Sequence, residues 1–197
     1  MTTTVIDLLR HGEVEGGAVY RGSTDDILTE NGWQQMVAAL EDKKDWDTIY
    51  SSPLESCCEF AELIATEDDI DLEISKAFQE IDFGLWEGLS PDEIMKEDAE
   101  LLATWWKSPT KVSPPEGEDF HDFQARVLKA FKNIITENRG NKILLVTHSG
   151  VIRVILMYIL SMQEEAFFRI NVDYASFSRI HIYHDDTGDT VSLIQHG

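Results

Sequence analysis

The chain has 197 residues, with 37 Asp and Glu against 16 Lys and Arg, so that its formal net charge is −21. Hydrophobic residues make up 43% of the chain, which is too much for a disordered acidic protein and enough for a real core. Nucleic acid and anionic lipid are both bound by clustered cations, so this charge argues against either as a partner. We expect one domain, residues 1–197, with no nucleic-acid or membrane partner.

Segments that would direct the chain out of the cytoplasm are missing from the sequence. The N-terminus has no basic region followed by an apolar stretch, and the most apolar run, 151–162, is interrupted by Arg153 and is too short to span a membrane. Cys57 and Cys58 are adjacent and poorly placed to bridge each other, which is typical of reduced side chains. These features predict a cytoplasmic protein.

Strand and helix signals alternate along the chain. Short apolar runs at 4–9, 47–51 and 142–147 read as strands, and the last is continuous, as expected of a strand covered on both faces. Apolar residues at helical spacing follow at 33–40, 54–61 and 120–134. The pattern predicts an α/β fold with a mainly parallel central sheet and helices on both faces.

Two further segments depart from this alternation. Residues 176–184 and 190–196 flank a run of turn residues and predict a C-terminal antiparallel hairpin that supplies edge strands. Between about residues 86 and 120 lies a proline-rich, partly helical excursion that opens with Ser90-Pro91-Asp92-Glu93, a pattern typical of a helix N-terminus. We expect this small cap to cover a binding site.

Polar residues that could carry chemistry follow two of the predicted strands. Arg10-His11-Gly12-Glu13 ends the first strand, and Thr147-His148-Ser149-Gly150 ends the strand at 142–147. Open α/β sheets bind ligands at the carboxyl ends of their strands, and the amides that open the following helix favour an anion. Two histidines, an arginine and a helix N-terminus at one edge predict a phosphate pocket. The alternative is two unrelated histidines at strand ends.

The segment Leu9-Arg10-His11-Gly12-Glu13 resembles the signature of the histidine phosphatase superfamily, which includes the cofactor-dependent phosphoglycerate mutases. The similarity covers nearly the whole chain. The form Phe-Gly-Leu-Trp-Glu-Gly at 83–88 and the short length look most similar to α-ribazole phosphatases of cobalamin assembly and to related small phosphomonoesterases. Other segments in the family's order are 22–29, 51–54, 80–88 and 146–153.

The resemblance implies four catalytic roles. His11 would be the nucleophile that becomes a phosphohistidine, which requires a neutral imidazole. Arg10 and His148 would bind the equatorial phosphate oxygens. Glu80 would protonate the leaving oxygen and then act as base toward water, which calls for a raised pKa. The resemblance implies no metal and no cofactor.

Other side chains have weaker claims. We expect Arg21 to touch phosphate or substrate, with an ordinary surface arginine as the even alternative, and Ser149 to lie at the substrate. Asp82 and Glu87 are weaker acid candidates. The residues that we interpret as structural, or as ordinary surface residues, are Glu13, Arg126, Arg153 and His121, and the pair Trp105-Trp106 reads as a core or cap anchor. His181 and His184 are three apart on a predicted strand and point to opposite faces, which is poor spacing for metal ligands.

One position breaks the family pattern. The helix after Ser51-Ser52-Pro53-Leu54 usually brings a second phosphate-binding arginine, and here that position is Ser56, which we still expect to lie at the substrate. Loss of one such donor costs roughly 3 kcal/mol of transition-state stabilisation, or about a hundredfold in rate. The sequence therefore predicts weakened rather than abolished activity.

Taken together, these features predict a metal-independent phosphomonoester hydrolase that acts through phospho-His11 on a small phosphorylated substrate, preferably α-ribazole 5′-phosphate. The alternatives are a broad-specificity phosphatase, a mutase, a phospholigand-binding protein without turnover, and a metal hydrolase that uses His11, His148 and Glu80. A homodimer is a further expectation.

Overall fold

The computed structural model describes residues 2–41, 43 and 45–197. Within these residues, six strands form one sheet in the order β3-β2-β4-β1-β5-β6. Their bounds are Thr2–Arg10 (β1), Thr48–Ser51 (β2), Asp71–Ile74 (β3), Lys142–Thr147 (β4), Phe177–Asp185 (β5) and Gly188–His196 (β6). Strands β1 to β4 pair in parallel, and β5 pairs antiparallel with both β1 and β6. The predicted α/β class and C-terminal hairpin are confirmed. Of the two hairpin strands, however, only β6 lies at an edge of the sheet, because β5 is internal. The opposite edge, β3, has no counterpart in the sequence prediction.

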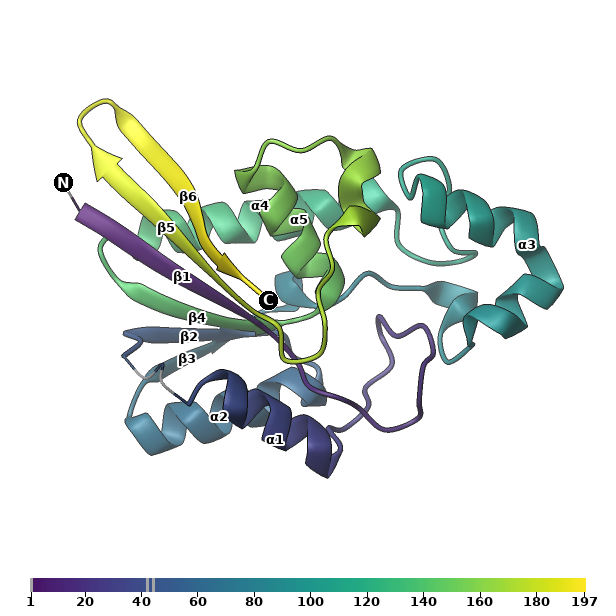
Figure 1. Cartoon of the computed structure of the whole chain (residues 1–197), viewed down its shortest axis with the longest axis horizontal. Helices are drawn as coiled ribbons and strands as arrows, with labels where there is room; N and C mark the ends of the chain where they lie inside the picture. The colour runs from purple at the N-terminus through teal and green to yellow at the C-terminus, as the bar shows by residue number, and fades with distance from the viewer. Residues whose placement is uncertain (1, 42, 44) are drawn as a thin grey trace.

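Helices cover both faces of this sheet. Figure 1 shows α1 and α2 on one face and α4 and α5 on the other. Their bounds are Glu30–Ala39 (α1), Glu55–Asp68 (α2), Pro91–Lys107 (α3), Phe120–Glu137 (α4) and Ser149–Ile159 (α5), and short 3-10 helices span Lys76–Phe78 (η1), Gly84–Trp86 (η2) and Glu164–Arg169 (η3). No helix of the described residues is long and apolar enough to cross a membrane.

The core is divided by the sheet into two apolar clusters. Successive strand side chains point to opposite faces, so Leu8 of β1 belongs to the cluster under α4 and α5, whereas Leu9 belongs to the cluster under α1 and α2. The predicted apolar face of α4 is fully buried. The predicted face of α1 is correct for Met36 but wrong for Val37, which is 56% exposed because α1 turns it away from the sheet.

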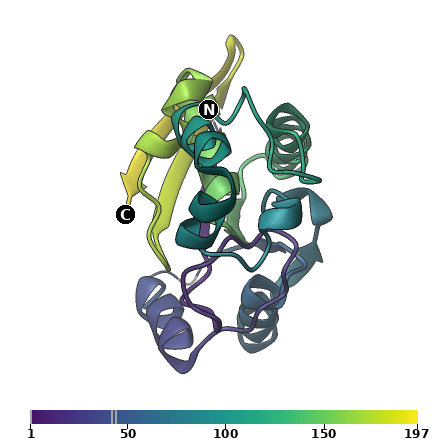
Figure 2. The same cartoon turned by 90° about the vertical axis from the view of Figure 1, so that its right-hand side faces the viewer.

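The predicted excursion crosses the carboxyl ends of the parallel strands. Ser90 begins α3 with a capping box, in which its side chain accepts from the amide of Glu93 and the Glu93 side chain accepts from the amide of Ser90. Helix α3 bends at Asp98, whose backbone is not helical. Figure 1 places α3 beyond the ends of β1 and β4, and Figure 2, which looks from that side, shows it in front of the sheet. The excursion therefore stands over the edge at which the sequence predicts a phosphate pocket.

Candidate active site

The sheet itself brings the two strand-end histidines together. Strands β1 and β4 are parallel neighbours, and Arg10 stands opposite Thr147 in their register. The residues that follow, His11 and His148, therefore leave the sheet side by side, and their ring centroids are 5.1 Å apart in an edge-to-face arrangement. The predicted convergence of the two histidines is confirmed.

His11 is held as a neutral imidazole with a defined tautomer. Its Nδ1 lies 2.8 Å from the carbonyl oxygen of Gly12, which can only accept, so Nδ1 carries the proton and Nε2 carries the lone pair. Burial, helped by the charge of Arg10, lowers the pKa of His11 to about 3. A Cβ on Gly12 would lie 2.2 Å from the carbonyl oxygen of Gly32, so only glycine permits this close turn. His11 therefore has the form that a nucleophile needs at neutral pH.

His148 precedes α5 and is anchored from the α2 side. Its Nε2 lies 2.7 Å from the hydroxyl oxygen of Ser52 and 3.6 Å from the sulfur of Cys57. Burial, together with the nearby charge of Arg10, holds the pKa of His148 well below its usual value. This ring is therefore neutral at neutral pH, and a phosphate dianion bound beside it would favour its protonated form.

Arg10 points its guanidinium group into the pocket under constraint. Its Nη1 donates to the carbonyl of Val172 at 2.8 Å, and the guanidinium carbon lies 4.2 Å from the ring centre of Tyr174. Its Nε is buried and has no hydrogen-bond partner among the described residues. A buried donor without an acceptor is rare in proteins, and an anion in the pocket would supply the acceptor.

Glu80 lies in the loop between η1 and η2, and the first turn of α5 holds its carboxyl group. It accepts from the amide of Gly150 at 2.8 Å, from the amide of Ile81 at 3.1 Å and from the hydroxyl of Ser149 at 3.3 Å. A Cβ on Gly150 would lie 2.2 Å from Glu80 Oε1, so glycine is required for this contact. Burial raises the pKa of Glu80, which meets the expectation of a raised value. The amide of Gly150, expected to face phosphate, is thus bonded to Glu80.

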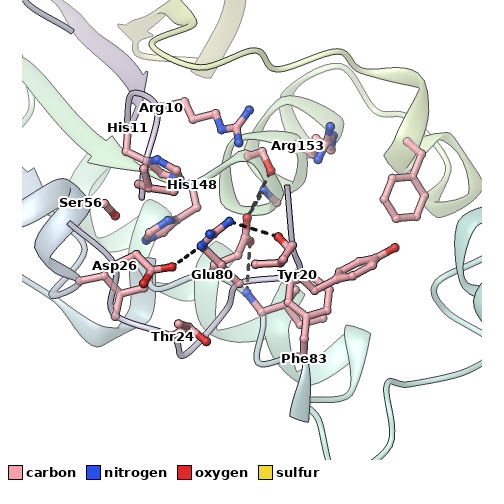
Figure 3. A pocket seen from close by; sticks show the side chains of 18 of the residues that line it. Arg10, His11, Tyr20, Thr24, Asp26, Ser56, Glu80, Phe83, His148 and Arg153 are labelled. Carbon is pink, nitrogen blue, oxygen red and sulfur yellow. Dashed lines mark hydrogen bonds and ion pairs between the residues drawn. The ribbon is translucent and has the colours of Figure 1, made fainter. Parts of the chain in front are cut away.

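These residues line one pocket of about 200 Å³, which also contains Ser56. Figure 3 shows Ser56, His11 and His148 on one side of Glu80, and Tyr20 and Phe83 on the other. Ser56 is buried in the first turn of α2, and its hydroxyl lies 4.0 Å from the sulfur of Cys57. No described basic side chain lies on α2. The cationic lining residues are Arg10, Arg21 and Arg153.

Arg21 lines the same pocket, but its own loop uses its donors. Its Nε is paired with Asp26, and its Nη groups donate to the carbonyls of Gly17 at 2.6 Å and Glu15 at 2.7 Å. The structure thus brings Arg21 to the pocket wall with its charge already matched. A direct contact between Arg21 and phosphate stays a prediction.

The other acidic residues accept hydrogen bonds from backbone amides or side chains of neighbouring segments. The carboxylate of Glu87 accepts from the amides of Gly22, Ser23, Thr24 and Phe83, which ties the loop after β1 to η2. Asp82 accepts from the amide of Gly84 at 2.8 Å, and Glu13 accepts from Thr29 and Asn31 at the start of α1. None of these three lines the pocket among the described residues.

Sequence reasoning missed several residues of the pocket. Arg153 was interpreted as structural because it lies on a helix, yet it is a lining residue. Asp26, the partner of Arg21, lines the pocket and was also missed. So was Tyr174, which is not a lining residue but covers Arg10 and lies 5.8 Å from the His11 ring. The two tryptophans that were predicted as a core or cap anchor have different environments. Trp105 is buried at the pocket, whereas Trp106 is exposed and donates to the hydroxyl of Tyr20 at 2.7 Å. No local sequence signal marks these contacts, which join distant segments.

The whole chain resembles known proteins in sequence. It is 32% identical over 201 residues to the "Bifunctional protein Rv2228c" of Mycobacterium tuberculosis, in a match that covers 100% of this chain and 55% of that protein. The chain thus spans about half the length of this relative. It is also 28% identical to the "Adenosylcobalamin/alpha-ribazole phosphatase" of Escherichia coli, over 89% of this chain and 88% of that protein.

The fold and the family agree with that similarity. The solved structure of Bacillus stearothermophilus YhfR superposes with a TM-score of 0.86 at 27% identity, and the match covers 97% of this chain and 96% of that one. The family model described as "Histidine phosphatase superfamily (branch 1)" matches residues 6–193, which include every strand-end and loop residue of the pocket. The chain belongs to the histidine phosphatase superfamily.

Proposed function

We propose that this chain is a metal-independent phosphomonoester hydrolase in which His11 carries the phosphoryl group. The observation that carries the proposal is the His11 imidazole, which is neutral and lies 5.1 Å from the His148 ring. Its Nε2 has no hydrogen-bond partner among the residues that the structure describes. A neutral imidazole with a fixed tautomer is a competent nucleophile, and phosphoryl transfer otherwise needs mainly positioning and charge stabilisation.

In the first step, the Nε2 lone pair of His11 attacks phosphorus as the bond from phosphorus to the alcohol oxygen breaks. The buried carboxyl group of Glu80, with its raised pKa, gives its proton to the departing alcohol. Arg10 and His148 stabilise the charge on the equatorial oxygens, and the unpartnered Nε of Arg10 is free for this contact.

In the second step, water attacks the phosphohistidine and the bond from Nε2 to phosphorus breaks, which restores neutral His11. The Glu80 carboxylate takes the proton of the attacking water and is again ready to act as an acid. Inorganic phosphate then leaves. Protons balance over the cycle, and no metal or cofactor takes part.

We further propose α-ribazole 5′-phosphate as the preferred substrate. The support is the 28% identity to the E. coli adenosylcobalamin/alpha-ribazole phosphatase over most of both chains. The second candidate is a phospholigand-binding protein with little turnover, which is favoured by the uncharged Ser56 and by the pairing of Arg21 with Asp26.

The test compares wild type with His11→Ala on p-nitrophenyl phosphate and α-ribazole 5′-phosphate. The variant loses the nucleophile, so we expect a fall of roughly 10⁴-fold or more in kcat/KM on both substrates. Wild-type protein quenched in alkali during turnover of radiolabelled substrate should retain alkali-stable label on histidine. The matched control is His121→Ala, because His121 is exposed on α4 and faces Glu164 rather than the pocket.

Equal turnover by His11→Ala and wild type would assign the activity to another site. A wild-type protein that binds phosphate but never retains label would favour the binding protein. Hydrolysis of unrelated phosphomonoesters as fast as α-ribazole 5′-phosphate would contradict the substrate preference and leave the hydrolase intact.

A further inference from the structure

Five aromatic side chains form one continuous wall of the pocket, and the proposed chemistry uses none of them. We name this set the aromatic wall, and its members are Tyr20, Phe83, Trp105, Phe167 and Phe168. Neighbouring ring centres are 4.8 Å apart for Tyr20 and Phe83, 6.1 Å for Phe83 and Trp105, 6.2 Å for Trp105 and Phe168, and 4.9 Å for Phe167 and Phe168. The wall therefore joins four segments that are far apart in sequence.

The aromatic wall lies on the leaving-group side of the reacting centre. Figure 3 shows His11 and His148 on one side of Glu80 and the wall residues Tyr20 and Phe83 on the other. Glu80 protonates the departing oxygen, so the alcohol must extend past its carboxyl group, away from His11. The rings are thus the surface that the alcohol half of a substrate meets.

Arg153 adds a cation at the same place. Its Nε donates to the carbonyl of Ile170 at 3.0 Å, and its guanidinium carbon lies 5.6 Å and 5.8 Å from the ring centres of Phe167 and Phe168. Its two Nη groups have no hydrogen-bond partner, and no carboxylate pairs with it, among residues 2–41, 43 and 45–197. A half-buried guanidinium group beside aromatic faces, with donors to spare, suits an oxygen acceptor on a ligand.

The wall lacks a partner for a positive charge. The acidic residues that line the described pocket are Asp26 and Glu80. Asp26 is paired with Arg21, and Glu80 is bonded to the first turn of α5. An alcohol that carries an ammonium group would therefore bring an unpaired charge next to Arg153 and the rings.

We propose, resting on the hydrolase function above, that the aromatic wall and Arg153 select phosphomonoesters whose leaving group carries a flat aromatic ring and an oxygen acceptor, and disfavour amino alcohols such as ethanolamine. Phe168 stacks on the outer part of the leaving group, and the free Nη groups of Arg153 donate to its acceptor. Arg153 is thus a specificity-determining residue rather than a helix-surface residue.

The first test compares substrates whose leaving groups have similar acidity. We expect kcat/KM for 2-naphthyl phosphate to exceed that for phenyl phosphate by about tenfold, because the second ring is buried against the wall. We expect O-phosphoethanolamine to be hydrolysed at least about tenfold less efficiently than glycerol 3-phosphate, because the ammonium group faces Arg153 without a counter-charge.

The second test substitutes residues of the site one at a time. For each variant it measures the ratio of kcat/KM between two substrates. Phe168→Ala should lower the naphthyl-to-phenyl ratio at least about threefold; Phe168 is 39% exposed, so its loss spares the core. The matched control is Tyr158→Ala, an aromatic residue of similar exposure (44%) on α5 that does not line the pocket, and it should keep the wild-type ratio. Arg153→Gln should lower the ratio of 3-carboxyphenyl to phenyl phosphate about tenfold.

Equal kcat/KM for the two aryl phosphates, or a ratio that Phe168→Ala leaves unchanged, would overturn this inference while His11-dependent hydrolysis stands. Absence of turnover on every substrate would instead contradict the proposed function. In that case, calorimetric binding of 2-naphthylmethylphosphonate against methylphosphonate decides the inference, with tighter naphthyl binding expected and equal binding contradicting it.

Discussion

The two sides of the pocket are built from different kinds of structure. On the phosphate side, His11 and His148 follow adjacent parallel strands whose register places them together, and hydrogen bonds hold both rings. On the leaving-group side, the aromatic wall comes from the loop after β1, from the η2 region, from α3 and from η3. The sheet therefore positions the chemistry, and the excursions around it shape the space that the alcohol occupies.

The two sides also differ in what holds their side chains. Each phosphate-side residue has a polar contact of defined geometry, such as the 2.8 Å contact between Arg10 Nη1 and the carbonyl of Val172. The wall residues contact one another mainly through their rings, and Phe168 is partly exposed. Substitutions on the phosphate side should thus change the rate on every substrate, whereas those on the wall should change the choice among substrates.

Among the substitutions that test this comparison, the largest change in activity is expected at Glu80, which lies between the phosphate side and the leaving-group side. Glu80→Gln keeps an acceptor for the amide of Gly150 but has no proton to give, so kcat/KM on alkyl phosphates, which reports the departure of the leaving group, should fall about 10²- to 10⁴-fold. p-Nitrophenyl phosphate should lose less, because nitrophenolate leaves without a proton. Steady-state kinetics of the variant on both substrates measure the difference.

The pH profile gives a second readout for the same variant. Wild-type activity on alkyl phosphates should fall as pH rises through the raised pKa of Glu80, because the proton donor is then lost, and Glu80→Gln should lack that fall. Asp82→Asn is the control, since Asp82 bonds the amide of Gly84 and lies outside the pocket lining. An equal loss of kcat/KM on both substrates would argue against proton donation by Glu80.

A gain of activity is expected at Ser56, on the phosphate side. Ser56→Arg supplies a guanidinium group to the phosphate oxygens and should raise kcat/KM roughly a hundredfold on every substrate, without changing the naphthyl-to-phenyl ratio. The control is Ser56→Met, which adds a long side chain without charge and should give no gain. A Ser56→Arg protein that folds and yet gains nothing would show that the existing cations already saturate the phosphate.

The smallest effect concerns stability and tests the burial of the phosphate side. Native His11 has a pKa of about 3, whereas in the unfolded chain its pKa is about 6.5, so between these values the unfolded state binds the extra proton. The contribution of neutral His11 is therefore complete above pH 6.5 and is lost as pH falls. From pH 7 to pH 5 it amounts to about 2 kcal/mol of unfolding free energy.

Urea unfolding of wild type and His11→Asn at pH 7 and pH 5 measures this difference. On going from pH 7 to pH 5, the unfolding free energy of the variant should fall by about 2 kcal/mol less than that of wild type. His121→Asn, at an exposed position, should keep the wild-type pH dependence. Identical pH dependence in wild type and His11→Asn would mean that the His11 ring is solvated, and the distinction between a buried phosphate side and a more open wall would fail.

Much of the architecture could be predicted because it depends on local patterns. The continuous apolar run 142–147 coincides with β4, the alternation after residue 176 becomes the hairpin of β5 and β6, and Ser90 with Glu93 caps α3. The pairing of His11 with His148 was also predictable, since carboxyl ends of parallel strands share one edge of a sheet. Strand β3 was missed because it is a short edge strand with mostly exposed side chains.

The amino-acid sequence by itself thus determined the α/β class with most strands of the sheet, the two histidines at its edge and the absence of an arginine at position 56. Only the tertiary structure decided that burial keeps His11 neutral, that Glu80 occupies the first turn of α5, that Asp26 pairs with Arg21, and that Arg153 joins an aromatic wall. The physical reason is the range of the interactions. Strand and helix patterns arise between near neighbours in the chain, whereas desolvation and ion pairing depend on which distant segments pack together.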